Sequence, residues 1–306
     1  MTTPPYIDAT TLAALVPMTS AIDAIEQALL DGWPGRDPLR TPVPVSSGEF
    51  LLMPSEAPEY VGIKITTVAP GNPARRLPRI QGTYILHDAG SLTPLALLDG
   101  TALTALRTPA LSAVATRHLA APDASELVVV GTGPQAFGHV HAMRAVRDIR
   151  RVGVVGRTEQ ATNDLVLRLR DMGIAAYPAG RPDVAGADII CLCTTARSPV
   201  FPDAWFGDRP HVNAVGSHEP TARELEAATI ARGQVVVESR DAALTEAGDL
   251  LMAFAEGVPA EVIRADLVEL VHGAPVDRQQ MTIFKSVGLA WQDLAVAALA
   301  YGRLAT

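Results

Sequence analysis

Hydrophobic and polar positions change their spacing along this chain. Residues 18–30 carry apolar side chains at helical intervals and predict a helix, with Thr19 and Ser20 as its N-cap candidates. The Gly- and Pro-rich stretch 31–48 is predicted to be a loop. Four short apolar runs follow, and AGSLTP between the last two is typical of a hairpin turn. They predict an antiparallel or mixed sheet with strands at EFLLMP, YVGIKITTV, IQGTYILHD and LALLDG.

A second pattern begins near residue 108. Thr108 and Pro109 are predicted to be the N-cap and first residue of a helix that runs to about Leu119. Continuous apolar runs then alternate with helices at 135–147 and 159–171, which is typical of buried parallel strands in a doubly wound sheet. These runs are ELVVV, RVGVV, ADIICLC, HVNAVG and QVVVES. The fold class predicted is α/β, with a Rossmann dinucleotide-binding domain.

The apolar tail predicts a C-terminal helix, and the length and composition predict a globular chain of two domains. The tail from Phe284 to Leu304 is predicted to be one long helix. The length of 306 residues suggests two domains at roughly 150 residues each. Apolar residues make up 48% and charged residues 19%, so the chain is globular rather than disordered.

Composition also indicates the cellular location of the protein and the classes of partner that it binds. No apolar run approaches the ~20 residues of a membrane span, and residues 1–11 show no secretory signal. The two cysteines, Cys191 and Cys193, lie in one apolar run and are interpreted as packing residues of a cytoplasmic protein. The net charge of −8, without a basic stripe, argues against a nucleic-acid partner. No metal-ligand motif is present, so no metal is expected.

The strand ELVVV leads directly into a GxGxxA motif, with a strand before it and a helix after it. In this context the motif predicts a dinucleotide site. Its glycines allow a tight turn and a close approach of a pyrophosphate to the helix N-terminus, and the final alanine is small enough for helix–strand packing. The alternative is a glycine-rich turn that holds no ligand. The residues are Gly131, Thr132, Gly133, Pro134, Gln135 and Ala136.

The end of the next strand indicates which cofactor is bound. An NAD enzyme usually carries Asp or Glu there to bind the ribose 2′-hydroxyl, whereas this chain has Gly156, Arg157 and Thr158. A carboxylate would repel a 2′-phosphate, and an arginine with a hydroxyl would bind it. NADP(H) is therefore the expected cofactor, with NAD(H) as the second choice. The alternative for Arg157 is a solvated side chain that caps the turn.

Several blocks together identify a family. The chain resembles the ornithine cyclodeaminase/mu-crystallin family over essentially its whole length. The resemblance implies a Rossmann domain over 116–284 and a smaller α/β domain, 1–115 with the C-terminal helix 285–306, which dimerises and carries much of the substrate site. The matching blocks are LLMP, VGIKITTVAPGN, LALLDGTALTALRTPALSAVA, VVVGTGPQA, ADIICLCTT, HVNAVGS and TIFKSVGLAWQDLA.

The resemblance assigns candidate substrate residues. Arg107 matches a family arginine that holds the substrate carboxylate, and the predicted helix start at Thr108 would strengthen such an anion site. Its alternative is a pair with a surface carboxylate. Lys64, whose strand face taken alone is interpreted as solvated, matches a family lysine near the reacting nitrogen and is a candidate proton donor. Arg40 matches a second carboxylate contact, and Arg79 is a candidate lining residue.

Three positions depart from the cyclodeaminases that the chain resembles. Those proteins carry Glu at the position of Leu51 and Asp at the positions of His218 and Lys285. Cyclodeaminase chemistry needs such carboxylates near the substrate amines, so their loss favours the ketimine reductase branch. His218 is predicted at the carboxyl end of the sheet, as a proton donor or, alternatively, as a helix cap or solvent-facing side chain. Thr194 and Thr195, at the end of ADIICLCTT, are expected to contact the cofactor.

The predicted function is reduction of a cyclic ketimine acid, such as Δ1-pyrroline-2-carboxylate, to an L-amino acid by an NAD(P)H-dependent homodimer. Arg107 and Arg40 would hold the carboxylate of this imino acid, and Lys64 and His218 would supply the proton. Two alternatives stay open. One is an ornithine cyclodeaminase, which converts L-ornithine to L-proline and ammonia. The other is a non-catalytic, NADPH-gated binding protein.

Overall fold

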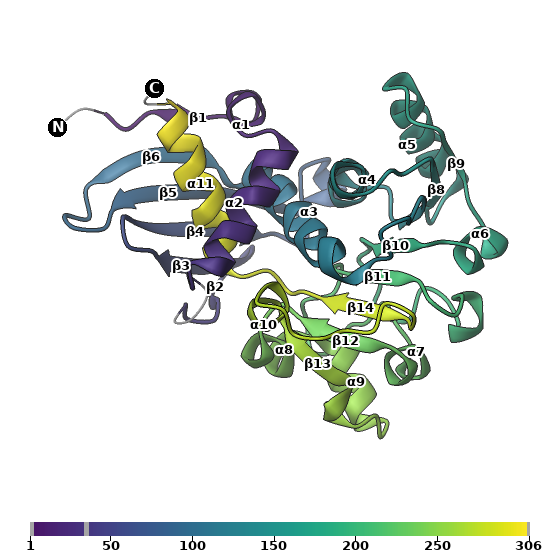
Figure 1. Ribbon diagram of the computed structural model, residues 1–306. Helices are drawn as coiled ribbons and strands as arrows, with labels where there is room; N and C mark the ends of the chain where they lie inside the picture. Colours follow the sequence, from purple (N-terminus) through teal and green to yellow (C-terminus); the bar gives the residue numbers. More distant parts are fainter. Residues whose placement is uncertain (1–2, 34–36, 305–306) are drawn as a thin grey trace. The chain divides into compact units, whose positions relative to one another are not determined.

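A computed structural model describes residues 3–33 and 37–304 of the chain (Figure 1). Residues 1–2, 34–36 and 305–306, which belong to the expected N-terminal segment, loop and C-terminal helix, lie outside the described residues. The chain divides into two compact units. Unit 1 comprises Met1–Leu111 and Leu289–Thr306, and unit 2 comprises Ser112–Gly288. The expected boundaries, after residues 115 and 284, each differ from these by four residues.

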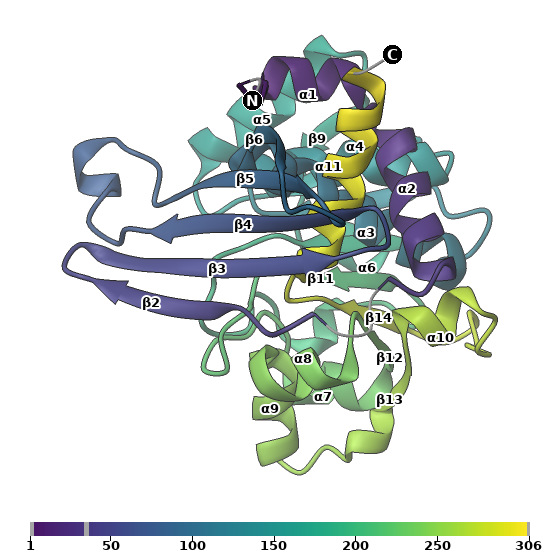
Figure 2. The same cartoon turned by 90° about the vertical axis from the view of Figure 1, so that its left-hand side faces the viewer.

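Unit 1 is built on a six-stranded mixed sheet of order β1-β6-β5-β4-β3-β2 (Figure 2). β1 pairs with β6 in parallel, and the remaining neighbours pair antiparallel. The predicted hairpin joins β5 to β6. The strands are β1 (Tyr6–Ile7), β2 (Thr41–Val45), β3 (Gly48–Glu56), β4 (Tyr60–Val68), β5 (Ile80–Asp88) and β6 (Pro94–Asp99).

The C-terminal helix α11 packs on β3 and β4, and α2 packs beside α11. α2 buries Ile22, Ile25 and Leu29 along one stripe, as its apolar spacing predicts. It begins after Pro17, which is extended, so the predicted caps Thr19 and Ser20 lie inside its first turn. The helices are α1 (Ala9–Leu15), α2 (Met18–Leu30), α3 (Gly100–Leu119) and α11 (Ala290–Leu304), with a 3-10 turn at Pro73–Arg75.

Strand β2 lies inside the stretch 31–48, which was expected to be a loop. Its sequence TPVPV contains two prolines, which remove backbone donors and are typical of a loop. At the edge of a sheet these missing donors cost little, because one side of the strand has no neighbour. β2 is such an edge strand, paired with β3 alone.

Helix α3 begins at Gly100 and not at Thr108. Asp99 caps this earlier start, since its Oδ1 accepts hydrogen bonds from the backbone N–H groups of Thr101 and Ala102, at 2.9 Å each. Pro109 therefore lies inside the helix, where it removes one backbone hydrogen bond without ending the helix. The prediction of a helix start at Thr108 and Pro109 is wrong.

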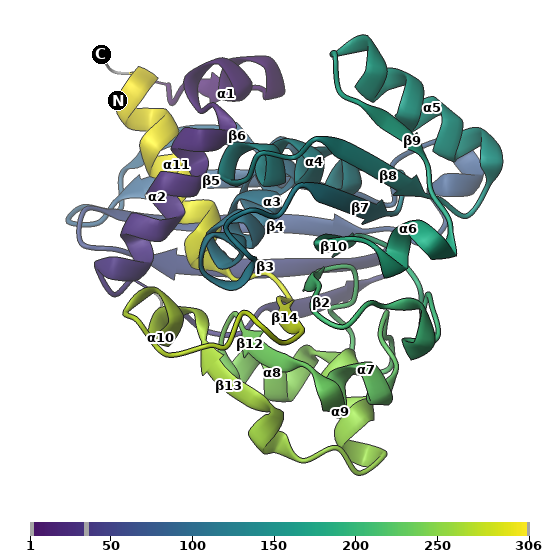
Figure 3. The same ribbon diagram turned by 45° about the vertical axis from the view of Figure 1, so that its right-hand side comes forward.

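Unit 2 is a doubly wound Rossmann-type domain with an eight-stranded parallel sheet of order β13-β12-β14-β11-β10-β7-β8-β9 (Figure 3). Its strands are β7 (Glu126–Val130), β8 (Arg151–Val155), β9 (Ala176–Pro178), β10 (Ile189–Leu192), β11 (His211–Ala214), β12 (Gln234–Val237), β13 (Ile263–Asp266) and β14 (Thr282–Lys285). Its helices, besides the end of α3, are α4 (Pro134–Val146), α5 (Glu159–Asp171), α6 (Arg181–Ala185), α7 (Ala227–Arg232), α8 (Arg240–Glu246), α9 (Gly248–Ala255) and α10 (Leu267–Val271), with 3-10 turns at Asp203–Trp205 and Ala260–Val262.

Strand β14 corrects the prediction for the C-terminal tail. The tail was expected to be one helix from Phe284, but TIFK forms a central strand between β11 and β12, and α11 begins only at Ala290. The strand is four residues long, and its apolar run continues through a short connection into an apolar helix. Periodicity alone therefore merges the two elements.

The helix lengths and the placement of His, Cys, Asp and Glu side chains bear on membrane insertion and metal binding. No helix of the described residues is by itself long and apolar enough to cross a bilayer; α1 and α2, bent by 74° at their junction, meet the criteria only when taken together. Among the same residues, no group of three or more His, Cys, Asp or Glu side chains is arranged to hold a metal ion.

Candidate active site

Lys64 lies on the buried face of β4, and the interpretation of this face as solvated is wrong. Lys64 pairs with Met53 on β3 and Tyr84 on β5, and all three side chains are buried. On the same face, Gly62 makes room for the Tyr84 hydroxyl, which would lie 1.8 Å from a Cβ at position 62. The sheet therefore places an amine in a dry environment.

The ammonium of Lys64 is paired with a carboxylate of α11. Its Nζ lies 2.6 Å from Oδ2 of Asp293 and 3.3 Å from Oγ1 of Thr104. Burial and the positive charge of Arg107 lower the pKa of Lys64 to about 8, although Asp293 opposes this shift. Because a proton donor works best when its pKa lies near the working pH, Lys64 is suited to proton transfer.

Arg107 lies in the middle of α3, so the N-terminus of its own helix does not add to its charge. Its Nε lies 3.4 Å from Oδ1 of Asp293, and its Nη1 donates a hydrogen bond to Oε1 of Gln292 at 2.8 Å. The alternative of a surface carboxylate partner is wrong, because the Asp293 side chain is 0% exposed. Lys64 and Arg107 thus share one buried acid.

Both cations keep unused hydrogen-bond donors. An ammonium has three N–H groups, and Lys64 uses two of them, on Asp293 and Thr104. Nη2 of Arg107 donates to no acceptor within residues 3–33 and 37–304. A substrate carboxylate matches such donors, since guanidinium and ammonium groups bind planar carboxylates through charge-assisted hydrogen bonds.

The other two predicted substrate arginines lie in different settings. Arg40, in the segment before β2, is half-buried, and its positive charge contributes to the lowered pKa of Lys64. Arg79 is exposed beside the start of β5, and its carbonyl accepts a hydrogen bond from the backbone N–H of Ala69 at 2.8 Å. The structure therefore brings Lys64, Arg107 and Arg40 together and leaves the side chain of Arg79 at the surface of unit 1.

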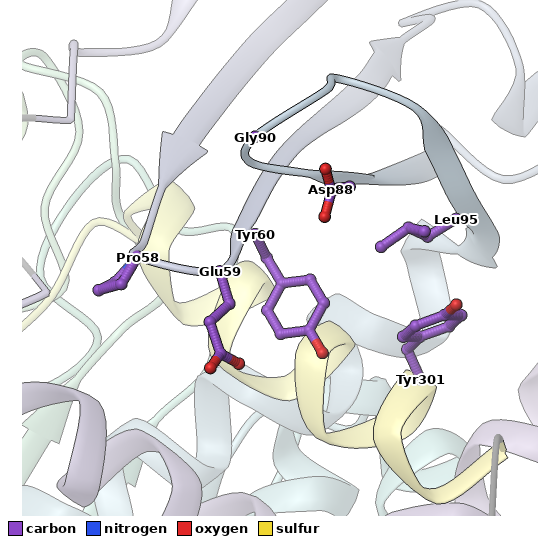
Figure 4. A pocket seen from close by; sticks show the side chains of 7 residues that line it. All are labelled: Pro58, Glu59, Tyr60, Asp88, Gly90, Leu95 and Tyr301. Carbon is purple, nitrogen blue, oxygen red and sulfur yellow. The ribbon is translucent and has the colours of Figure 1, made fainter.

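A shallow pocket of about 440 Å³ opens elsewhere on unit 1 (Figure 4). Two tyrosines in it meet edge to face, with ring centroids 6.3 Å apart. Its lining includes none of the predicted substrate residues, so it is not the candidate site. The lining residues are Pro58, Glu59, Tyr60, Asp88, Gly90, Leu95 and Tyr301.

In unit 2 the GxGxxA segment has the geometry of a dinucleotide loop. Gly131 has φ 119° and approaches the residue after β10 so closely that a Cβ would lie 2.5 Å from the carbonyl oxygen of Cys193. Gly133 is the N-cap of α4, and a Cβ there would meet no atom within 4 Å. Pro134 opens the helix and Ala136 is fully buried against the sheet. The helix N-terminus is left open to an anion, so these residues fit a dinucleotide pyrophosphate.

The turn after β8 carries the residues predicted to bind the ribose. Gly156 packs against the first loop, since a Cβ there would lie 2.6 Å from Cγ2 of Thr132. Thr158 is the N-cap of α5, and its Oγ1 accepts a hydrogen bond from the backbone N–H of Ala161 at 3.3 Å. Arg157 is exposed and forms no ion pair with any described residue. Thr158 rather than Arg157 therefore caps this turn, and the guanidinium is available to a ligand.

A buried acid that the sequence did not point to organises the next loop. Oε1 of Glu224 accepts hydrogen bonds from the backbone N–H and the hydroxyl of Thr194, at 2.8 and 2.7 Å, and Oε2 accepts one from the N–H of Gly216 at 2.8 Å. Burial and the nearby Asp249 raise the pKa of Glu224 to about 7. Glu224 thus ties together the loops after β10 and β11. Thr195, the other predicted contact, is exposed.

Lys285, at the end of β14, forms a second buried lysine–aspartate pair. Its Nζ lies 2.9 Å from Oδ2 of Asp249 and donates a hydrogen bond to the carbonyl of Ser217 at 2.6 Å. His218 follows Ser217 directly, after the carboxyl end of β11, and is half-buried. Lys285 therefore fixes the backbone that leads into His218.

Known proteins resemble this chain across both units. The sequence profile of the ornithine cyclodeaminase/mu-crystallin family matches residues 8–306. The chain belongs to this family.

Two of the proteins that this chain is similar to are named Δ1-pyrroline-2-carboxylate reductases. A Δ1-pyrroline-2-carboxylate reductase of Bacillus cereus is 42% identical over 278 residues, which cover 87% of this chain and 85% of that protein. The structure of the Thermococcus litoralis Δ1-pyrroline-2-carboxylate reductase in complex with NADH and L-proline has a TM-score of 0.92 and 33% identity, over 98% of this chain and 97% of that one.

An archaeal alanine dehydrogenase, solved as a dimer with bound NAD, is also similar. It has a TM-score of 0.91 and 29% identity, and the match covers 99% of this chain and 96% of that one. The agreement over nearly the whole length confirms the family resemblance and the Rossmann-type fold.

The sequence analysis did not predict the two buried aspartates, Asp249 and Asp293, that pair with the lysines. Lys64 and Lys285 are the only lysines among 25 basic residues, and each is buried against an aspartate, Asp293 or Asp249. A signal for Asp293 is present in the block TIFKSVGLAWQDLA, where Gln292 and Asp293 interrupt an apolar helix. Charged residues are rarely buried without a partner, so this interruption indicates a buried polar contact.

Proposed function

We propose that this protein is an NAD(P)H-dependent oxidoreductase that reduces a cyclic ketimine acid, such as Δ1-pyrroline-2-carboxylate, to an L-amino acid. The observation that carries the proposal is the buried cluster of Lys64, Asp293 and Arg107 with its unused N–H donors. It occurs in a chain that is 42% identical to a Δ1-pyrroline-2-carboxylate reductase. Such a cluster binds a carboxylate and holds a proton close to it.

The residues of unit 1 have distinct roles in this proposal. Arg107, with Arg40 as a second cation, binds the substrate carboxylate. Reduction of the C=N bond adds a hydride to the carbon and a proton to the nitrogen, and the reduced nicotinamide supplies the hydride when it is bound. Lys64 donates the proton, with His218 of unit 2 as the alternative donor. Because the pKa of Lys64 is about 8, its amine carries the proton at neutral pH.

The residues of unit 2 would hold the cofactor. The N-terminus of α4 would bind the pyrophosphate, and the turn after β8 would bind the adenosine ribose. Thr194, fixed by Glu224, would contact the cofactor from the loop after β10. The set is Gly131, Thr132, Gly133, Pro134, Gln135, Ala136, Gly156, Arg157, Thr158, Thr194 and Thr195.

NADPH oxidation against a panel of cyclic and acyclic imino acids tests this function. Oxidation with Δ1-pyrroline-2-carboxylate, and formation of L-proline, are the expected results. Release of ammonia from L-ornithine without net change in nicotinamide absorbance would instead show a cyclodeaminase. Tight NADPH binding with no turnover would show a binding protein. If His218 is the donor, His218→Ala flattens the pH dependence of kcat, whereas an unchanged rate and profile assign the proton to Lys64 or water.

NADPH is expected to bind more tightly than NADH. The exposed guanidinium of Arg157 forms no described ion pair, and no carboxylate in the turn would repel a 2′-phosphate. A charge-assisted contact to phosphate contributes about 1.5–3 kcal/mol, so Arg157→Ala should weaken NADPH binding about tenfold or more. NADH binding should change little. Equal dissociation constants for the two cofactors in a fluorescence titration of the wild-type chain would refute the preference.

A homodimer formed through unit 1 is also proposed. The archaeal alanine dehydrogenase that this chain resembles is a dimer. The cross-strand neighbours Val43 and Phe50 are 40% and 37% exposed, and Val45 and Ile80 are each 47% exposed. Burial of such apolar side chains drives association. Light scattering at micromolar concentration should give twice the chain mass of 32.2 kDa, and Val43→Glu should shift the mass towards the monomer. A monomer mass for the wild type would contradict the proposal.

A further inference from the structure

Asp293 contacts Lys64 and Arg107, the two cations that act on the substrate in the proposed function. We propose that Asp293 is the positioning residue of this site: its carboxylate is the shared counter-ion that fixes the ammonium of Lys64 and the guanidinium of Arg107 while leaving their other N–H groups to the substrate. The inference rests on the proposed function, because it assigns Asp293 a part in ketimine reduction.

The geometry divides the carboxylate between the two cations. Oδ2 lies 2.6 Å from Nζ of Lys64, and Oδ1 lies 3.4 Å from Nε of Arg107. The preceding residue, Gln292, accepts a hydrogen bond from Nη1 of Arg107 at 2.8 Å. One turn of α11 therefore orients both side chains. Asp293 lies in the first turn of this helix, where the helix dipole stabilises a negative charge.

The charge balance requires this carboxylate. Lys64 is 2% and Arg107 is 5% exposed, and two cations buried side by side without an anion would be strongly destabilised. With Asp293 ionised, the cluster carries one excess positive charge, which a substrate carboxylate neutralises. The charged groups that act on Lys64 are Arg107 of α3, Asp293 of α11 and Arg40 of the segment before β2. Tyr84 of β5 is the neighbouring titratable group, and the negative charges of Asp293 and Asp37 act on it.

Lysine and arginine differ at a buried ion pair in whether the cation can release a proton. The chain has two lysines among its 25 basic residues, so arginine carries nearly all of its positive charge. A guanidinium at position 64 would stay charged at all accessible pH values. An ammonium can release its proton when it is buried. The lysine–aspartate pair therefore combines fixed orientation with a transferable proton.

The two lysines allow a direct test that does not depend on turnover. Protein labelled with 13C at lysine Cε gives two lysine signals, which Lys285→Arg assigns. In the wild-type chain the Lys64 signal is expected to titrate near pH 8. Asp293→Asn removes the negative charge that favours the ammonium. The Lys64 titration should therefore move to lower pH by about one unit or more.

The pH profile of ketimine reduction provides the second readout. Lys64 must be protonated to act as a donor, so kcat/KM with NADPH and Δ1-pyrroline-2-carboxylate should fall as the pH rises through about 8. In Asp293→Asn this fall should begin at lower pH, and at about pH 9 the rate should be about tenfold lower relative to wild type than at about pH 6. Asp293→Glu keeps the charge but displaces it, so it should keep the profile and lower kcat.

Asp249→Asn is the matched control, because it makes the same change beside the other buried lysine. Because Asp249 pairs with Lys285, this control should leave the Lys64 titration in place. An unmoved Lys64 titration and an unmoved pH profile in Asp293→Asn would overturn the inference. If that variant does not fold, a wild-type kcat in Asp293→Glu would overturn it equally. If the wild-type chain reduces no ketimine acid, the proposed function fails, whereas the lysine titrations still test the pairing.

Discussion

Replacement of Arg107 by alanine is expected to lower kcat/KM for Δ1-pyrroline-2-carboxylate by about a hundredfold or more. The guanidinium is buried in α3 and has Nη2 available to a carboxylate. Removal of one partner from a buried, hydrogen-bonded charge pair costs about 2–5 kcal/mol, and every 1.4 kcal/mol corresponds to about a factor of ten. Initial rates of NADPH oxidation over a range of substrate concentrations measure the loss.

Arg107→Lys tests whether the positive charge at position 107 is sufficient or whether the planar guanidinium is also needed. A lysine keeps the positive charge but has no planar fork for Gln292, Asp293 and a carboxylate at the same time. We expect a kcat/KM between those of the wild type and the alanine variant. NADPH affinity should stay at the wild-type value in both variants, since the predicted cofactor residues lie in unit 2. A wild-type kcat/KM in Arg107→Ala would show that the carboxylate binds elsewhere.

Lys285→Met is expected to lower the free energy of unfolding by about 3–5 kcal/mol, the usual cost of removing one partner from a buried ion pair. Lys285 is 1% exposed, and its Nζ lies 2.9 Å from Oδ2 of Asp249, whose side chain is fully buried. The substitution would leave the Asp249 carboxylate buried beside Glu224 without its cation. It would also remove the hydrogen bond to the carbonyl of Ser217. Urea unfolding followed by circular dichroism measures the change.

A double variant identifies the cause of this loss. In Lys285→Met/Asp249→Leu no buried charge lacks its partner, so much of the stability should return. The backbone N–H groups of Glu224 and Leu225, which donate to Oδ1 of Asp249 at 2.6 and 2.9 Å, would still lack an acceptor, so recovery should be incomplete. A loss of less than about 1 kcal/mol in the single variant would mean that solvent reaches the pair.

Several elements could be predicted because their signals are local. β4, β7, β8 and α5 have the predicted bounds to the residue. Alternating or continuous apolar runs mark the three strands, and the Thr158 side chain caps α5 from three residues away. The glycine-rich turn before α4 is equally local, since Gly131 and Gly133 act through the backbone of their own turn. The pattern of runs therefore suffices to predict an α/β chain with a Rossmann domain.

The sequence mispredicted other elements, because neighbouring residues favour different starts or different kinds of structure. The dipeptide Thr108-Pro109 is a good helix start, but Asp99 caps an earlier one and the helix continues through the proline. β2 contains two prolines and is a strand only because the edge position tolerates them. β14 is too short to be separated from the following helix by periodicity alone, and its pairing with β11 and β12 makes it a strand.

The sequence by itself determined the α/β class and the glycine-rich turn between β7 and α4, and through the family resemblance it predicted Lys64 and Arg107 as substrate residues. The tertiary structure alone decided what surrounds them. Lys64 and Asp293 are 229 positions apart, and no local pattern relates residues at such a distance. Their contact forms because helix α11 packs on the sheet of unit 1. Burial then lowers the pKa of Lys64 to about 8, and this shift depends on the fold rather than on neighbouring residues in the sequence.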